Sequence, residues 1–151
     1  MIAGFADPAV RPARCEIAVT GLDELIEAAA RVRANAYAPY SRFAVGAAIR
    51  AEDGTLHAGA NVENAAYPQS QCAEASAIGA MVAAGRRRIA EIAIVADGPA
   101  LCAPCGGCRQ RIREFAAPEV PIHLCGPDGL RRTLTLGELL PFAFGPDNLP
   151  P

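Results

Sequence analysis

Two short segments decide what this sequence can form: Cys72-Ala73-Glu74, and further along Pro104-Cys105-Gly106-Gly107-Cys108. Side chains three positions apart on the opening turn of a helix project from one face, so the sulfurs of Cys105 and Cys108 can reach a single ion. The 33 positions between Cys72 and Cys105 leave room for a helix and a strand that return Cys72 as a third ligand. Three protein ligands leave tetrahedral zinc one open position for water, which is typical of catalytic sites.

Glu74 is predicted to lie beside that water. Positions two apart on a regular helix point in nearly opposite directions, so Cys72 and Glu74 share a site only if the helix is just beginning. The sequence therefore predicts a helix that starts at about Cys72.

The cysteines also allow other interpretations. A Cys-x-x-Cys pair can be a redox pair, and buried thiols can be inert. Cys102 stands three residues before Cys105, so it could replace Cys108 in the pair. We favour Cys105 and Cys108 because Pro104 suits the start of a helix, where its missing N–H costs nothing. Cys15 and Cys125 are expected to be structural.

Composition narrows the class of protein. The 151 residues fit one domain, and the apolar fraction of 52% with no Trp indicates a tightly packed core of small residues. No segment reaches the roughly 18 apolar residues of a membrane span, and no basic leader opens the chain, so we expect a cytoplasmic protein that does not bind membranes. Six cysteines in a reducing compartment favour metal binding or catalysis over disulfides. A net charge of −2 disfavours nucleic acid and favours a small-molecule substrate.

Hydrophobic periodicity and turn residues predict alternating helices and strands. Residues 1–19 are expected to be an extended arm within a single 1–151 domain. The predicted order is a helix over 20–37, strands over 43–50 and 55–62 joined at Asp53-Gly54, a helix from about 72 to Gly85, a strand over 89–97, a helix over 105–115, strands over 121–125 and 131–136, and a short helix over 137–140. This order predicts an α/β fold, a three-layer α/β/α sandwich with a mixed sheet of about five strands.

Two apolar segments suggest burial at the centre of a domain or against another subunit. From Ala73 to Gly85 the sequence carries no charge after Glu74 and is apolar on every side, which is typical of a helix buried at the centre of a domain or an assembly. Residues 139–144, Leu-Leu-Pro-Phe-Ala-Phe, form an apolar tail, which suggests burial against another subunit.

Taken together, these residues resemble the small homotetrameric cytidine deaminases. The resemblance covers most of the chain beyond the arm, and it is carried by residues 40–48 (Tyr-Ser-Arg-Phe-Ala-Val-Gly-Ala-Ala), 61–65 (Asn-Val-Glu-Asn-Ala), 67–68 (Tyr-Pro), 72–74, 104–110 and 144–146 (Phe-Gly-Pro). It implies deamination of cytidine and deoxycytidine to uridine and deoxyuridine in pyrimidine salvage. It also implies one zinc ion per subunit, held by Cys72, Cys105 and Cys108, and a proton-transferring Glu74.

The resemblance also implies a set of substrate contacts. Phe43 would pack on the base and Asn61 and Glu63 would bind the ribose hydroxyls, although ordinary turn chemistry is the alternative for Asn61. Phe144 would close the pocket of a neighbouring subunit and Tyr67 would lie at that interface, with a plain core role as the alternative. The implied substrate-binding set is Phe43, Asn61, Glu63, Tyr67, Ala73 and Phe144.

The sequence departs from the family at one position. Many members place Arg directly after the catalytic Glu, whereas this chain has Ala75. Three thiolates on one zinc ion sum to −1, which weakens acidification of a bound water. The N-termini of the two helices, or Arg109, could compensate.

Three other functions remain open from the sequence. An aminohydrolase of a modified cytosine nucleoside, such as a blasticidin deaminase, shares Cys-Ala-Glu. A non-catalytic zinc-binding or redox module would make Glu74 incidental. A nucleic-acid editor is disfavoured by the charge and by the lack of a basic, aromatic groove.

Overall fold

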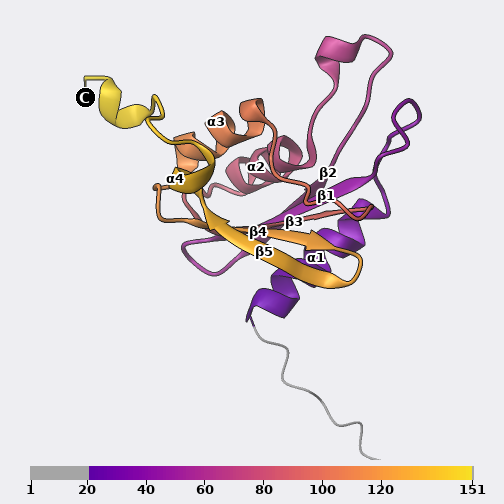
Figure 1. Cartoon of the computed structure of the whole chain (residues 1–151). Coiled ribbons are helices and arrows are strands. Elements are labelled where there is room, and N and C mark those ends of the chain that lie inside the picture. Colours follow the sequence, from indigo (N-terminus) through magenta and orange to yellow (C-terminus); the bar gives the residue numbers. More distant parts are fainter. Residues whose placement is uncertain (1–20, 151) are drawn as a thin grey trace, which may run out of the picture.

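One mixed five-stranded sheet, in the order β2-β1-β3-β4-β5, forms the centre of the structure (Figure 1). The computed structural model describes residues 21–150, so the predicted arm over 1–19 lies outside the described residues. Only β3 and β4 pair in parallel; the other neighbours are antiparallel. The strands are β1 (Val45–Ala51), β2 (Leu56–Ala60), β3 (Ile89–Ala96), β4 (Pro121–Gly126) and β5 (Gly129–Thr135).

Helices cover both faces of this sheet. One face packs against α1 (Gly21–Arg33), and the other carries α2 (Ala73–Ala83), α3 (Gly106–Phe115) and the short α4 (Leu136–Leu139). Two 3-10 turns, Tyr67–Gln69 and Pro146–Asn148, complete the described elements. The arrangement confirms the predicted three-layer sandwich with a mixed sheet.

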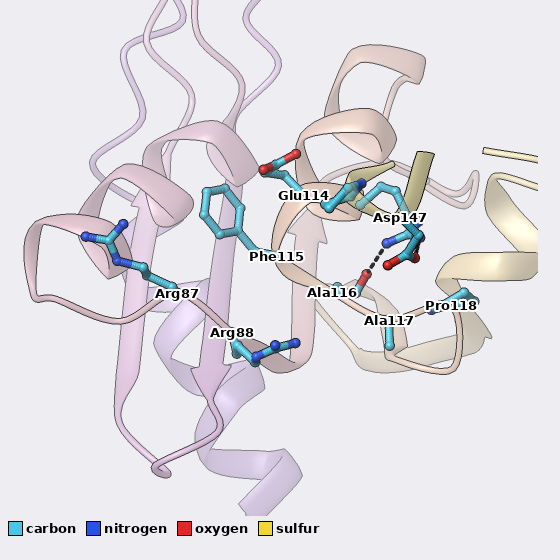
Figure 2. A pocket seen from close by; sticks show the side chains of 10 residues that line it. Arg87, Arg88, Glu114, Phe115, Ala116, Ala117, Pro118 and Asp147 are labelled. Atoms are coloured by element: carbon cyan, nitrogen blue, oxygen red, sulfur yellow. Dashed lines mark hydrogen bonds and ion pairs between the residues drawn. The ribbon is translucent and has the colours of Figure 1, made fainter. Parts of the chain in front are cut away.

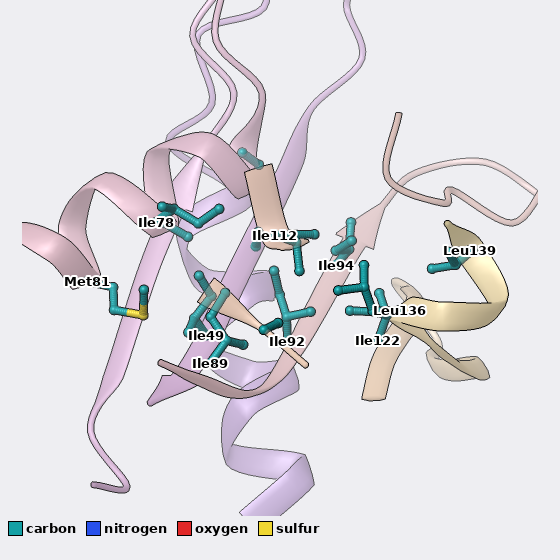
Figure 3. Packing of buried hydrophobic residues seen from close by; sticks show 14 of the residues in the cluster. Ile49, Ile78, Met81, Ile89, Ile92, Ile94, Ile112, Ile122, Leu136 and Leu139 are labelled. Carbon is teal, nitrogen blue, oxygen red and sulfur yellow. The ribbon is translucent and has the colours of Figure 1, made fainter. Parts of the chain in front are cut away.

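The two faces of the sheet are built from alternating residues of the same strands. On β3, Ile92 and Ile94 join the cluster beneath α2 and α3, whereas Ala93 and Val95 face α1. Figure 3 shows the larger cluster, in which isoleucines from the strands meet Met81 of α2. Both faces are covered by helices, so the central strand β3 is apolar apart from Glu91 and does not alternate with polar residues.

Glycines let the helices approach the sheet closely. A Cβ on Gly59 of β2 would lie 2.3 Å from the backbone N of Ala77 in α2, and one on Gly46 of β1 would lie 2.1 Å from the carbonyl O of Ala29 in α1. Because any side chain at either position would meet backbone atoms, glycine sets the spacing between the layers. The tight packing of small residues expected from the composition is therefore found where the helices contact the sheet.

Helix α2 begins and ends as predicted but is not buried on every side within one chain. Cys72 is its N-cap, and Gly85, with φ +80°, follows its end with hydrogen bonds from Gly85 N to Val82 O and from Arg86 N to Met81 O. This is the left-handed cap that the sequence indicated. Gly79, Ala80 and Ala83 nevertheless remain exposed in the single chain.

Several predicted boundaries were wrong. Helix α1 ends at Arg33 rather than Tyr37, because Tyr37 N donates to Asn61 O and pairs with Val62 as a short bridge. The first strand begins at Val45 rather than Phe43 and the second ends at Ala60 rather than Val62.

The last strand begins at Gly129 rather than Arg131, because Pro127-Asp128 form a tight hairpin turn before a glycine with φ +110°. No helix within residues 21–150 has the length and apolar character needed to cross a membrane.

Candidate active site

The first ligand segment lies where an extended chain turns into α2. Val62 and Gln71 exchange two backbone hydrogen bonds of 2.9 and 2.8 Å, which hold Gln71 extended directly before Cys72. Cys72 has φ −72° and ψ 156° and is the N-cap, as predicted, so its side chain and that of Glu74 do not follow helical spacing. Ala73 is fully buried, and Glu74 is 5% exposed.

The second ligand segment opens α3, which crosses from β3 to the parallel strand β4. Cys105 is the N-cap with φ −64° and ψ 166°, and Cys108 lies in the first turn with its side chain fully buried. Pro104 therefore precedes the N-cap and is not the first helical residue, which corrects the position expected from the sequence.

The two segments bring three sulfurs together. The Sγ atoms of Cys72, Cys105 and Cys108 all lie within 4.8 Å of one another, and Cys72 Sγ is 3.9 Å from Cys105 Sγ. Tetrahedral zinc with Zn–S bonds of about 2.3 Å requires sulfurs about 3.8 Å apart, so the donor set and its spacing fit zinc. Among the described residues, Cys102 stands outside this group, so the alternative pairing is not the one formed.

Burial and crowding act on the ionisation of these thiols. Burial raises the pKa of Cys72 and Cys108, and the nearby Glu74 raises both further. Burial also opposes ionisation of Cys105, but the Cys108 N–H and the sulfurs of Cys108 and Cys72 bring the pKa of Cys105 below its ordinary value. A divalent cation would relieve this crowding, because it favours the thiolate form of each ligand.

Glu74 is a buried acid beside the sulfurs. Burial is the largest effect on it and raises its pKa, while Cys108 and the charge of Arg111 act in the opposite direction. A carboxyl group that holds a proton more readily than usual, next to a metal-binding group, has the chemistry of a general acid and base.

Comparison with known proteins identifies the family. The family model described as the cytidine and deoxycytidylate deaminase zinc-binding region matches residues 20–124. The chain belongs to this family. It is 42% identical over 128 residues to a cytidine deaminase of Sporosarcina psychrophila, covering 85% of this chain and 94% of that protein. It is 43% identical over 122 residues to one of Mycobacterium tuberculosis, covering 81% and 88%.

A solved structure agrees with the assignment. The crystal structure of cytidine deaminase from Burkholderia pseudomallei superimposes with a TM-score of 0.76 at 46% identity, covering 80% of this chain and 97% of that one. The matched family region contains Cys72, Cys105 and Cys108, so the zinc predicted from the sequence is confirmed as the cofactor of this deaminase fold.

Asn61 and Glu63, the two residues expected to bind the sugar, form hydrogen bonds with the loop before β1 in this structure. Asn61 accepts from Val45 N and donates to Phe43 O, both at 2.9 Å. Glu63 accepts from Tyr40 N at 2.9 Å, and from the backbone N and the hydroxyl of Ser41. These contacts fix the 40–45 segment, including the half-exposed Phe43, beside the end of β1.

The two aromatic residues expected at a subunit interface lie on exposed segments. Tyr67 is 71% exposed, on an excursion that stands out from the sheet in Figure 1, and its ring meets that of Tyr40 edge-on at 5.9 Å. Phe144 is 60% exposed on the C-terminal segment, which Figure 1 shows leading away from the sandwich, and its carbonyl accepts from Gln110 Nε2 at 3.0 Å. Tyr67 and Phe144 are therefore not part of the hydrophobic core of a single chain, which was the alternative considered for both.

Arg109 does not have the free charge that the sequence suggested. Its guanidinium donates to Pro104 O and to Leu139 O, both at 2.8 Å, so it ties the start of α3 to α4. Arg111, two positions later, is the arginine whose charge acts on Glu74, and it was not among the residues singled out from the sequence. The i, i+3 spacing of Cys108 and Arg111 on α3 was the available signal.

A large cavity lies at the other end of α3 and contains none of the predicted site residues. Figure 2 shows it at the ends of α2 and α3, near Arg88, Phe115 and Ala116. Arg113 donates to Ala116 O at 3.4 Å and to Asp147 at 2.8 Å, so its charge serves the C-terminus of α3 and a neighbouring carboxylate. These contacts indicate a structural role.

Proposed function

We propose that the chain catalyses the hydrolytic deamination of cytidine and deoxycytidine to uridine and deoxyuridine with release of ammonia. We place the reaction in pyrimidine salvage and in the cytoplasm. The observation that carries the proposal is the convergence of the three sulfurs with one buried acid, Glu74. Relatives that are more than 40% identical over most of their length are cytidine deaminases, which supports the same substrate class here.

The chemistry divides between the metal and Glu74. Cys72, Cys105 and Cys108 would hold a zinc ion, which would supply a Lewis acid that activates water for attack at C4 of the pyrimidine. Glu74 passes one proton of that water to ring N3, and then passes the proton of the hydroxyl left on C4 to the amino group, which departs as ammonia. Its burial excludes bulk water and raises its pKa, which favours a carboxyl group able to both hold and release a proton.

The loop around residues 40–45 and 61–63 is proposed to bind the nucleoside. Phe43 packs on the base, Asn61 and Glu63 bind the sugar hydroxyls, and Ala73 contacts the base between a zinc ligand and Glu74. A carboxylate offers about four acceptor positions, and Glu63 uses three on Tyr40 and Ser41, which leaves one for a hydroxyl. Sugar binding at Glu63 would therefore be coupled to the position of Phe43.

A homotetramer is proposed to complete each pocket. Phe142 is fully exposed and Phe144 is 60% exposed on an apolar C-terminal segment, more apolar surface than a monomer ordinarily leaves open. The exposed Gly79, Ala80 and Ala83 give α2 a small-residue face against which a second copy can pack closely. In this assembly Phe144 closes a neighbour's pocket and Tyr67 lies at the interface.

Metal analysis and turnover on one purified preparation test the catalytic proposal. We expect one zinc per chain and ultraviolet-detected loss of cytidine and deoxycytidine, with Glu74→Gln retaining zinc while kcat falls by about 100- to 10,000-fold. Glu27→Gln, the same change on the exposed face of α1, is the matched control and should be silent. Turnover of blasticidin S but not cytidine would favour the modified-nucleoside function, and full activity of Glu74→Gln would favour a module in which Glu74 is incidental.

Sedimentation of the same preparation tests the assembly. We expect four times the mass of one chain, and a smaller species for Phe144→Asp, because a charge at a buried aromatic position opposes association. A wild-type monomer that turns over cytidine would refute the proposed completion of the pocket by neighbours.

A further inference from the structure

Three arginines alternate along α3, and two of them have structural partners. Arg109 binds two carbonyl groups, and Arg113 binds Asp147 and the end of its own helix. Arg111 makes no hydrogen bond or ion pair with any residue of the described range 21–150. Arg111 is the sixth of the ten residues of α3 and lies before the last turn, where Arg113 already faces the negative end of the helix dipole, so the dipole does not explain Arg111.

Arg111 lies against the backbone that carries the metal ligands. Its Nη1 is 3.2 Å from where a Cβ on Gly107 would be, so the guanidinium folds back toward the N-terminus of α3. It also lines a cavity with Gln71 and Ala75. Gln71 precedes Cys72, Ala75 follows Glu74, and Gly107 lies between Cys105 and Cys108. The guanidinium therefore lies against the turn between Cys105 and Cys108, and it shares a cavity with the sequence neighbours of Cys72 and Glu74.

The metal centre would carry a net negative charge that a nearby cation can balance. Three thiolates and one divalent zinc carry a net charge of −1, and the buried Glu74 adds a second negative charge whenever it is ionised. The cavity beside Ala75 leaves room for a long side chain from α3, since Ala75 contributes only a methyl group. Glu114, one helical turn after Arg111, is the other charged residue lining this cavity.

We propose that Arg111 is the positive charge that balances the thiolate centre of Cys72, Cys105 and Cys108, and that it holds zinc in place electrostatically without coordinating it. Arg111 thereby takes the role that the sequence suggested for Arg109, which the structure commits to Pro104 and Leu139. The proposal rests on the proposed zinc-dependent function. It assigns Arg111 a supporting role rather than contact with the substrate.

Zinc release into an excess of a chromogenic chelator tests this role without using turnover. Arg111→Gln removes the charge but keeps a long polar side chain, and we expect release about tenfold faster than from wild type at low ionic strength. Arg111→Lys should restore most of the wild-type rate. The matched control is Arg87→Gln, which removes one positive charge from an exposed arginine that follows α2 in Figure 2 and has no partner within residues 21–150. It should change the rate less than twofold.

Two further experiments distinguish an effect of the Arg111 charge on zinc release from an effect of side-chain packing. Molar salt should shrink the difference between Arg111→Gln and wild type, because Arg111 is exposed and salt screens its charge. Adding Ala75→Arg to Arg111→Gln should slow release again, because position 75 lines the same cavity. Equal release from wild type and Arg111→Gln, or equal acceleration by Arg87→Gln, would overturn the proposal.

The outcome for Arg111 is distinguishable from that of the deaminase itself. A wild-type protein that retains zinc but does not deaminate cytidine would refute the proposed reaction, and the release rates would still decide the role of Arg111. A protein that deaminates cytidine while Arg111→Gln keeps its zinc as firmly as wild type would refute Arg111 alone.

Discussion

Replacing Gly59 with alanine should push α2, which begins at the proposed catalytic residues, away from the sheet. A Cβ at Gly59 would lie 2.3 Å from Ala77 N and 2.6 Å from both the carbonyl C and the Cβ of Ser76. Carbon atoms pack at about 3.5 Å, so β2 and α2 would have to move apart by roughly 1 Å. The obstacles are backbone atoms that no rotamer change can clear.

The cost follows from this geometry. Overpacking of a well-packed contact costs about 1–3 kcal/mol, and a backbone obstacle places Gly59→Ala near about 3 kcal/mol. For a chain of this size that corresponds to a fall in Tm of about 6–12 °C. Cys72 and Glu74 begin the same helix, and a displacement near 1 Å should also lower kcat/KM by about 100-fold.

Thermal and urea unfolding of the zinc-loaded protein, with cytidine turnover, measure these effects. The control is Gly21→Ala on α1, where the nearest atom to a new Cβ is 3.7 Å away, an ordinary contact. Its free energy of unfolding should be unchanged or rise by less than about 1 kcal/mol. An unchanged Tm and unchanged turnover for Gly59→Ala would refute the close approach of β2 and α2.

Three further substitutions test other parts of the fold. The hydrogen bond from Thr55 and the charge of Arg86 lower the pKa of Asp53 to about 2, so the stabilisation is present above pH 3.8 and is lost toward pH 2. Asp53→Asn should lower stability at neutral pH, and the gap to wild type should close over that acid range in urea titrations. Asn61→Ala frees the loop before β1 and should raise KM for cytidine more than it lowers kcat, measured in steady state. His123→Leu removes hydrogen bonds to Thr133, which is exposed, and to Glu91, which keeps Arg50, so it should cost about 1 kcal/mol by urea unfolding.

Local chemistry made the start of each ligand segment predictable. A cysteine and a glutamate two positions apart can share a site only at a helix start, and the structure places Cys72 at the N-cap of α2. The Asp53-Gly54 hairpin and the glycine after α2 were predictable for the same reason, since each depends on a few neighbouring residues. The order of layers followed from the alternation of elements.

Contacts between distant segments were not predictable. Tyr37 leaves α1 because it pairs with Val62, a partner that periodicity cannot identify. Thr135 and Glu138 form a capping box that places the last helix one residue earlier than expected, and this signal was present in the sequence. The two partners of Arg109 come from separate elements, which is why its charge was assigned to the wrong role.

The three sulfurs also have a consequence for how the chain holds together. Their ion would join two helix starts that are 33 residues apart, and in chain-entropy terms closing such a loop stabilises a protein by roughly 3–4 kcal/mol. Zinc is then a reversible crosslink between α2 and α3, one that works where thiols stay reduced and disulfides do not persist. Stripping the metal should accordingly expose the stretch between β3 and α3 to proteases before the sheet itself unfolds.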